Sequence, residues 1–226
     1  MTTSSSIPED TGNPRALVVL CGTVATAVVV LLALLVTHAW APLVDSDIRI
    51  DSAIHDWALR TPQAVDVALW LQDLGGTWWS TWFAVGTVLL LLVLRRWWLA
   101  LSVALVAALA PYLTDTLKPI VGRSRPTWVV PIETLHDPSF PSGHATGGIA
   151  VWMVCGLAIG SLLRDPSLGA LVALPFVVLG FAIGLSRLVL GVHWPSDVVA
   201  GWMVALAVTC LAGALFLARS RRPVVP

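Results

Sequence analysis

Charged side chains are scarce in this 226-residue chain: they make up 12% of it, whereas a soluble domain of this size carries roughly a quarter. Basic and acidic residues number 13 each, so the formal net charge is zero. With no basic patch and no accompanying aromatic motif, the sequence indicates no nucleic-acid partner. The three cysteines, Cys21, Cys155 and Cys210, all fall inside apolar runs. They indicate neither a disulfide framework nor a metal site, and we expect them to act as small packing residues.

The chain contains long apolar runs. Hydrophobic residues make up 57% of the chain, and the mean hydropathy is +0.85. An uncharged apolar run of about 18 residues or more is typical of a transmembrane helix. A soluble core cannot hide six such runs, so the sequence predicts an all-α fold, a six-transmembrane-helix bundle. The predicted spans are about 16–38, 77–94, 97–114, 145–163, 168–186 and 198–218.

The polar stretches divide the chain around these spans. We expect residues 1–14 to form a disordered cytoplasmic tail, 15–218 a single six-span membrane domain, and 219–226 a basic cytoplasmic tail. The segment 39–76 is too polar to span, but its apolar residues have helical spacing, which predicts one or two interfacial helices. Its "DSDIRID" stretch lacks the glycine and the final glutamate of a calcium loop, so we expect a solvated acidic helix start there.

The orientation depends on how the basic residues are used. Both faces of the predicted bundle carry nearly equal numbers of them. If Lys118, Arg125 and Arg187 serve a binding site, the remaining excess lies on the face that carries the termini, and the positive-inside rule places that face in the cytoplasm. We therefore expect a multi-pass protein of the plasma membrane with cytoplasmic termini and an extracytoplasmic site.

Three polar motifs interrupt the apolar pattern: "KPIVGRSRP" at 118–126, "PSGH" at 141–144 and "SRLVLGVHWPSD" at 186–197. Six spans place all three at one membrane face. Arg125 and Arg187 offer planar forks for phosphate oxygens, and Lys118 offers a compact charge. Ser142 can cap the following helix, and Gly143 lets an anion approach the backbone closely. Together these residues predict a phosphate-binding site.

Two histidines at the same face suggest the chemistry. Pro195 favours the first turn of a helix, which places Asp197 within reach of His193. A carboxylate on one imidazole nitrogen makes the other nitrogen a better nucleophile, and His144 is then free to act as general acid. Each residue also has an ordinary alternative: Ser142 as a plain cap, or Arg187 extending to the headgroups. Those alternatives do not explain why all of them converge on one face.

The order K-x6-R-P, P-S-G-H and S-R-x5-H-x3-D resembles that of the type 2 phosphatidic acid phosphatase (PAP2) family. The resemblance implies metal-independent hydrolysis, without a cofactor, of a lipid phosphomonoester or diphosphate such as phosphatidic acid, phosphatidylglycerol phosphate or polyprenyl diphosphate. It implies that His193, held by Asp197, forms a phosphohistidine while His144 protonates the leaving group. Arg123 lies outside the pattern, and we expect it to be a surface charge, with substrate contact as the alternative. The residues implied to bind the phosphoryl oxygens are Lys118, Arg125, Ser142, Gly143 and Arg187.

Three other functions fit parts of the same pattern. A transferase of the same fold would pass a phosphoryl or lipid headgroup to an acceptor lipid. Vanadate-dependent haloperoxidases share the motifs, but they are typically soluble, and six predicted spans argue against that reaction. A non-catalytic lipid-binding or transport protein would be expected to lack at least one catalytic residue, and none is missing from the motifs.

Overall fold

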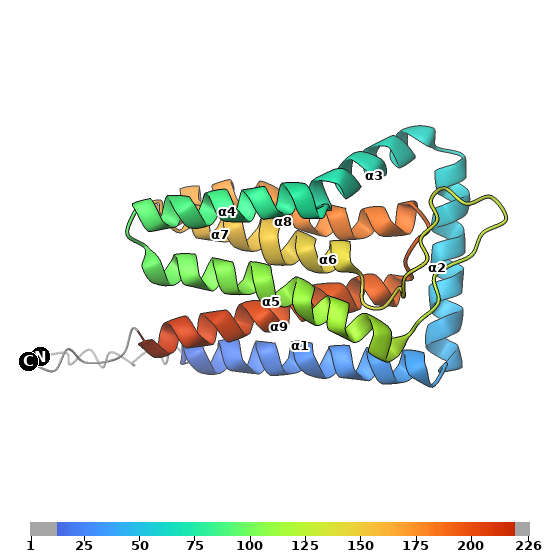
Figure 1. Ribbon diagram of the computed structural model, residues 1–226, viewed down its shortest axis with the longest axis horizontal. Helices are drawn as coiled ribbons and strands as arrows, with labels where there is room; N and C mark the ends of the chain where they lie inside the picture. Colours follow the sequence, from blue (N-terminus) through green and yellow to red (C-terminus); the bar gives the residue numbers. More distant parts are fainter. Residues whose placement is uncertain (1–12, 220–226) are drawn as a thin grey trace, which may run out of the picture.

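The computed structural model describes residues 13–219, a bundle of helices with one long irregular loop, residues 122–142 (Figure 1). The described residues contain no strand, so the predicted all-α fold is confirmed. The helices are α1 (Pro14–Thr37), α2 (Ala41–Leu59), α3 (Pro62–Gly75), α4 (Thr77–Val93), α5 (Trp97–Val121), α6 (Gly143–Gly147), the π-helical turn η1 (Gly148–Met153), α7 (Val154–Gly160), α8 (Pro166–Val189) and α9 (Pro195–Arg219).

The long helices run along one common direction, and α2 lies across one end of the bundle (Figure 1). Five continuous helical segments are long and apolar enough to cross a membrane: α1, α5, the α6–η1–α7 segment, α8 and α9. The predicted span 77–94 corresponds to α4, which is long enough to cross a membrane only together with α3, and the two helices meet at a 49° bend. The six predicted spans are therefore all present as helices, and the predicted interfacial segment contains α2 and α3.

The helix ends follow local sequence signals. Asn13 accepts a hydrogen bond from the amide of Arg15, so α1 begins at Pro14, close to the predicted domain boundary. The largest departure is at α5, which continues seven residues beyond the predicted end at residue 114, to Val121. It ends where Gly122 adopts a left-handed backbone with φ of 62°. This extension carries Lys118 beyond the apolar part of the span. The predicted tails, 1–14 and 219–226, lie almost wholly outside the described residues.

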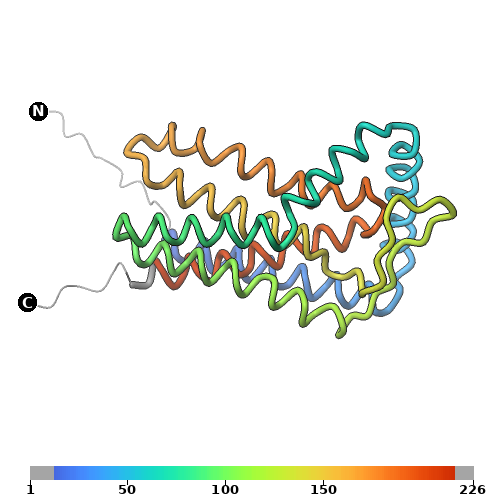
Figure 2. The backbone as a smooth tube through the Cα atoms, turned by 45° about the horizontal axis from the view of Figure 1, so that its top comes forward, coloured from blue at the N-terminus to red at the C-terminus, as the bar shows by residue number. Residues whose placement is uncertain are grey.

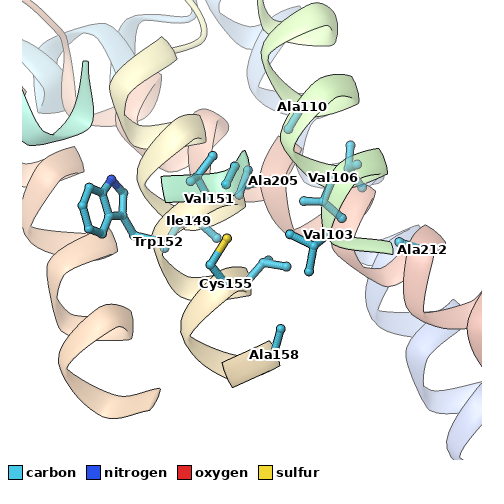
Figure 3. Close-up of a cluster of buried hydrophobic side chains, with 14 of the residues drawn as sticks. Val103, Val106, Ala110, Ile149, Val151, Trp152, Cys155, Ala158, Ala205 and Ala212 are labelled. Atoms are coloured by element: carbon cyan, nitrogen blue, oxygen red, sulfur yellow. The ribbon is translucent and has the colours of Figure 1, made fainter. Parts of the chain in front are cut away.

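The α6–η1–α7 segment is the centre of the bundle. In its span 61% of the residues are buried, against 11% in α1. Small and β-branched side chains from α5, η1, α7 and α9 pack around it, with Cys155 among them as a packing residue (Figure 3). A Cβ on Gly148 would lie only 2.5 Å from the carbonyl oxygen of Gly180, so the backbones of η1 and α8 approach closely. His144, the second residue of α6, is therefore carried by the most deeply buried segment of the bundle, while its own side chain stays partly exposed.

The α2 helix and the 122–142 loop lie together at the end of the bundle opposite the start of α1 (Figure 2). Asp47 and Asp51 of α2 are 2% and 0% exposed. The expectation of a solvated acidic helix start at "DSDIRID" is therefore wrong. The apolar side chains of α2, such as Ile48 and Ile50, are instead the exposed ones. A single-helix pattern cannot distinguish these two faces, because burial is decided by the charged groups that α2 meets.

Candidate active site

The loop between α8 and α9 holds the predicted nucleophile. His193 is 2% exposed, and its Nδ1 lies 3.5 Å from Oδ2 of Asp197. As predicted, α9 begins at Pro195 and Asp197 lies in its first turn. There Oδ2 also accepts a hydrogen bond of 3.0 Å from the backbone N–H of Trp194, in the manner of a capping box. The bend before His193 needs a glycine, because Gly191 has φ of 67° and a Cβ there would lie 2.7 Å from Nε1 of Trp128.

The other imidazole nitrogen faces a cation. Nη1 of Arg125 lies 3.0 Å from Nε2 of His193 and donates to the carbonyl oxygen of Val192. A neutral ring with its proton on Nδ1 fits both neighbours, since Nδ1 faces a carboxylate and Nε2 a donor. Burial lowers the pKa of His193 to about 4; Arg125 and Arg187 act in the same direction, and Asp197 opposes them. At neutral pH Nε2 is therefore unprotonated, and its lone pair faces the Arg125 N–H.

Two carboxylates from the 122–142 loop neutralise the three predicted phosphate-binding cations. Asp137 forms ion pairs with Lys118 and, at 2.9 Å, with Nη2 of Arg125. Glu133 accepts from Arg187 at 3.3 Å, and Gln72 of α3 accepts a second hydrogen bond from the same guanidinium. Although partial burial favours its neutral form, the hydrogen bond from Lys118 and the charge of Arg125 lower the pKa of Asp137 to about 2. The cations are thus gathered, and a phosphate would compete with these carboxylates for them.

The start of α6 is tied to the start of α9. The backbone N–H of Ser142 donates to the carbonyl oxygen of Asp197 at 3.0 Å, while its hydroxyl accepts from Ala145 at 3.4 Å as the cap of α6. Ser142 is fully buried, and beyond the neighbouring backbone only the Thr114 methyl carbon, at 3.9 Å, comes within 4 Å of where a Cβ on Gly143 would lie among the described residues. His144 and Arg187 line the same polar cavity. All eight predicted site residues therefore lie at one end of the bundle.

Two cavities meet at His144. One, about 530 Å³, runs between α4 and α5 from Thr77 and Asp115 down to Leu89 and Ala104, and small apolar side chains form most of its wall. The other, about 450 Å³, is polar and contains Gln72, Asp73, Glu133 and Arg187. His144 and Thr77 line both cavities. An apolar groove and a polar pocket therefore share one imidazole at their junction.

A family model described as the PAP2 superfamily matches residues 95–221, which include every predicted site residue. The chain belongs to the PAP2 superfamily. A solved structure agrees with this assignment at the level of the fold. The crystal structure of the first transmembrane PAP2-type phosphatidylglycerolphosphate phosphatase from Bacillus subtilis superimposes with a TM-score of 0.72 and 24% identity, covering 88% of this chain and 98% of that one. Its fold and the apolar helices described above make this PAP2 protein a multi-pass membrane protein.

Curated relatives of this PAP2 protein are phosphatases by name. A decaprenylphosphoryl-5-phosphoribose phosphatase of Mycobacterium tuberculosis (strain ATCC 25618 / H37Rv) is 38% identical over 118 residues, which is 51% of this chain and 58% of that protein. An undecaprenyl-diphosphatase of Sulfolobus acidocaldarius is 31% identical over 136 residues, 58% of this chain and 61% of that protein. The matches thus cover about three fifths of these relatives.

The expectation that Arg123 is a surface charge is wrong. Its side chain is 10% exposed and forms ion pairs with Asp197 Oδ1 at 2.6 Å and with Asp47 Oδ2 at 2.7 Å. The guanidinium also lies 5.5 Å from the centre of the Trp194 ring. Arg123 is therefore engaged by Asp47 and by Asp197, the carboxylate that faces the PAP2 histidine.

Sequence reasoning missed the acids that surround the PAP2 motifs. Glu133 and Asp137 lie in a loop without periodicity, and nothing in the local sequence indicates their partners. Polar residues do recur at 47, 51 and 55 on one face of α2, but polar residues also occupy its exposed face, so the pattern did not distinguish Asp47. Within residues 13–219, no group of three histidine, cysteine or acidic side chains is arranged to hold a metal ion.

Proposed function

We propose that this PAP2 protein is a lipid phosphatase that hydrolyses a phosphomonoester or diphosphate of a long-chain lipid through a phosphohistidine intermediate. The observation that carries the proposal is the meeting of the apolar groove and the polar pocket at His144. A lipid phosphate likewise has an apolar part and a polar part. Its chain fits the apolar groove, its headgroup fits the polar pocket, and its phosphorus lies between the two. The names of the relatives, which specify polyprenyl and glycerol lipids, support this class of substrate.

In the first half of the proposed reaction, Nε2 of His193 attacks phosphorus and the P–O bond to the lipid or leaving phosphate breaks. Asp197 holds Nδ1 and stabilises the positive charge that the ring gains. His144 donates its proton to the departing oxygen. Lys118, Arg125 and Arg187 bind the phosphoryl oxygens in place of the loop carboxylates, and their charges stabilise the transition state.

In the second half, the His144 imidazole, now neutral, takes a proton from water, and the hydroxide oxygen attacks the phosphohistidine. The P–N bond breaks, Nε2 of His193 recovers its lone pair, and inorganic phosphate leaves. Each residue returns to its starting protonation state over the cycle. An acceptor lipid in place of water would give the transferase reaction, so the products distinguish hydrolysis from transfer.

The distribution of cations supports an extracytoplasmic site. Four of the basic residues at the site end of the bundle, Lys118, Arg123, Arg125 and Arg187, are engaged in buried or site contacts, which leaves Arg49 and Arg60 exposed at this end. The connections at the opposite end carry basic residues without such partners among the described residues. Because free basic residues in short loops favour the cytoplasm, the site end faces outward in this proposal. The basic residues of the opposite end are Arg15, Arg95, Arg96 and Arg164.

The test is a phosphate-release assay on purified protein with phosphatidic acid, phosphatidylglycerol phosphate and polyprenyl mono- and diphosphates, each with and without a chelator. We expect release from at least one lipid, unchanged by the chelator, and loss of at least about 10³-fold in His193→Ala, because removing a covalent nucleophile eliminates its pathway. His144→Ala should slow the same step. No release by the wild type across the panel, or equal release by His193→Ala, would contradict the proposal.

A further inference from the structure

The inward face of α2 bears a stripe of titratable residues directly behind the site. Asp47, Asp51 and His55 are spaced four residues apart and are 2%, 0% and 3% exposed. Asp45 and Asp56, on the same helix, are exposed. All of α2 lies outside residues 95–221, the part of the chain that matches the family model. The stripe therefore lies outside the region that the family model describes.

Asp47 caps the helix that carries Asp197. Its Oδ1 accepts a hydrogen bond of 3.0 Å from the backbone N–H of Ser196, and its Oδ2 accepts from the Ser196 hydroxyl. Ser196 is the second residue of α9, and its amide is one of the N–H groups that a helix leaves without an internal partner. A negative charge at this position is also favoured by the helix dipole. Asp47 thus fixes the start of α9 from a different helix.

Arg123 connects Asp47 to the carboxylate that faces the nucleophile. Its Nη2 donates to Asp47 at 2.7 Å, and its Nη1 donates to Asp197 Oδ1 at 2.6 Å and to Ser196 Oγ at 2.7 Å. With Oδ1 held by Arg123, Oδ2 of Asp197 is directed toward Nδ1 of His193. The contacts form a continuous chain, Asp47–Arg123–Asp197–His193.

Burial makes this chain necessary. Asp197 is fully buried, and an unpaired carboxylate there would be strongly destabilised as an anion. The guanidinium supplies the compensating charge, and Asp47 in turn satisfies the second edge of that guanidinium. No ion pair or hydrogen bond among the described residues joins Asp47 or Arg123 to Lys118, Arg125 or Arg187. The chain therefore acts on the nucleophile and not on the phosphate-binding cations.

We propose that Asp47, acting through Arg123, is a positioning residue that keeps Asp197 ionised and directed at His193. The role rests on the proposed function, since it concerns the phosphoryl-transfer step. It assigns to the interfacial helix α2 a part in catalysis, although α2 contributes no group to the reacting atoms. Loss of the chain should lower kcat and leave the binding of substrate and of phosphate analogues nearly unchanged.

The experiment measures kcat, KM and inhibition by orthovanadate for Asp47→Ala, Asp47→Asn, Arg123→Ala and Arg123→Lys in the full chain. We expect kcat to fall about 10- to 100-fold in both alanine variants, with KM and the vanadate inhibition constant within about threefold, because a small misplacement of a reacting group costs this much. Asp47→Asn keeps an acceptor for Ser196. Arg123→Lys keeps the positive charge but cannot donate to Asp47 and Asp197 from two nitrogens at once. Both conservative variants should therefore lose less kcat than the alanine variants. Asp45→Asn, an exposed acid on the same helix, is the matched control and should match the wild type.

A double variant, Asp47→Ala with Arg123→Ala, separates positioning from general loss of structure. Because the two residues act in series on Asp197, the double variant should be no slower than Arg123→Ala alone; independent structural damage would multiply the losses. If the alanine variants do not fold, Asp47→Asn and Arg123→Lys carry the comparison. Wild-type kcat in the folded Asp47 variants, or multiplied losses, would overturn the positioning role while leaving the phosphatase intact. An inactive wild type would instead overturn the proposed function, and this role with it.

Discussion

Asp137 and His193 share one guanidinium: Nη2 of Arg125 lies 2.9 Å from the Asp137 carboxylate, and Nη1 lies 3.0 Å from Nε2 of the imidazole. The carboxylate is thus bound where a phosphoryl oxygen is expected to bind, one guanidinium away from the nucleophile. Its side chain is half exposed, so it can leave that position without unfolding the loop.

Removing the charge of Asp137 should strengthen the binding of phosphate analogues. In Asp137→Asn, Lys118 and Arg125 lose a competing anion, and we expect the orthovanadate inhibition constant to fall by up to about fivefold, equivalent to the ~1 kcal/mol of a partly exposed ion pair. Asp66→Asn, an exposed acid on α3, serves as the control. Weaker vanadate binding in Asp137→Asn would mean that the carboxylate organises the cations and does not compete for them.

The pKa of His193 is expected to determine how the rate of phosphoenzyme formation falls at low pH. Because burial lowers that pKa to about 4, the ring stays neutral from pH 7 down to about pH 5 and becomes protonated only below. In single-turnover measurements after a rapid pH jump, phosphoenzyme formation should therefore be nearly constant from pH 7 to 5. Below pH 4 it should fall about tenfold per pH unit. A midpoint near 6.5, the ordinary value for histidine, would contradict a buried, neutral nucleophile.

Asp51 makes the stability of the fold pH-dependent. Burial, with the charges of Asp197 and Asp47, raises the pKa of Asp51 to about 8 from an ordinary 3.8. Neither oxygen has a hydrogen-bond partner within residues 13–219. Between about pH 4 and 8 the folded protein holds a proton that the unfolded chain releases, so stability falls as the pH rises through this window and is unaffected below it.

Asparagine at position 51 does not titrate and removes this dependence. We expect the midpoint of thermal unfolding of Asp51→Asn to exceed that of the wild type by several degrees at pH 9, since ~1 kcal/mol corresponds to about 2–4 °C in a chain of this size. At pH 4.5 the two proteins should have the same midpoint of thermal unfolding. Asp56→Asn, exposed on the same helix, should show no such divergence; an equal offset at both pH values would refute the titration of Asp51.

The groove between α4 and α5 should select for chain length. From Thr77 to Leu89 its α4 wall extends about 18 Å along the helix, at ~1.5 Å per residue. In Ala107→Trp the indole would fill the middle of the groove, and we expect kcat/KM for a long-chain lipid phosphate to fall at least about tenfold. A short-chain analogue should be turned over almost as before. Ala170→Trp, at an exposed position on α8, is the control, and equal losses for both chain lengths would exclude the groove as the chain site.

The bundle itself was predictable from sequence because a membrane leaves a spanning chain few alternatives to a helix. The predicted spans agree with α1, α4 and α8 to within a few residues, since caps such as Asn13 and Asp165 stand at the ends of apolar runs. The grouping of the motif residues at one end was also predictable, because the number of spans between the motifs places all three on the same face. A run of apolar residues shows where a helix crosses the membrane, but not how far the helix continues through the polar residues that follow. The extension of α5 to Val121 was therefore not predicted.

The contacts around the motifs could not be predicted in the same way. Glu133 and Asp137 reach their partners from an irregular loop. A different path of this loop would change which cations the two carboxylates pair with. Asp47 and Arg123 are 76 residues apart and pair between helix α2 and the 122–142 loop, which share no sequence pattern. Such pairs depend on tertiary packing. The sequence identified the charged residues, but it did not determine which of them compensate one another.

The hydrogen bond from Ser142 N–H to the Asp197 carbonyl has a kinetic consequence. It joins the start of α6, which carries His144, to the start of α9, which carries Asp197, through main-chain atoms, so the relative position of these two helix starts does not depend on side-chain rotamers. In the proposed reaction, the remaining rearrangement before phosphoryl transfer is the release of the loop carboxylates Asp137 and Glu133 from the cations.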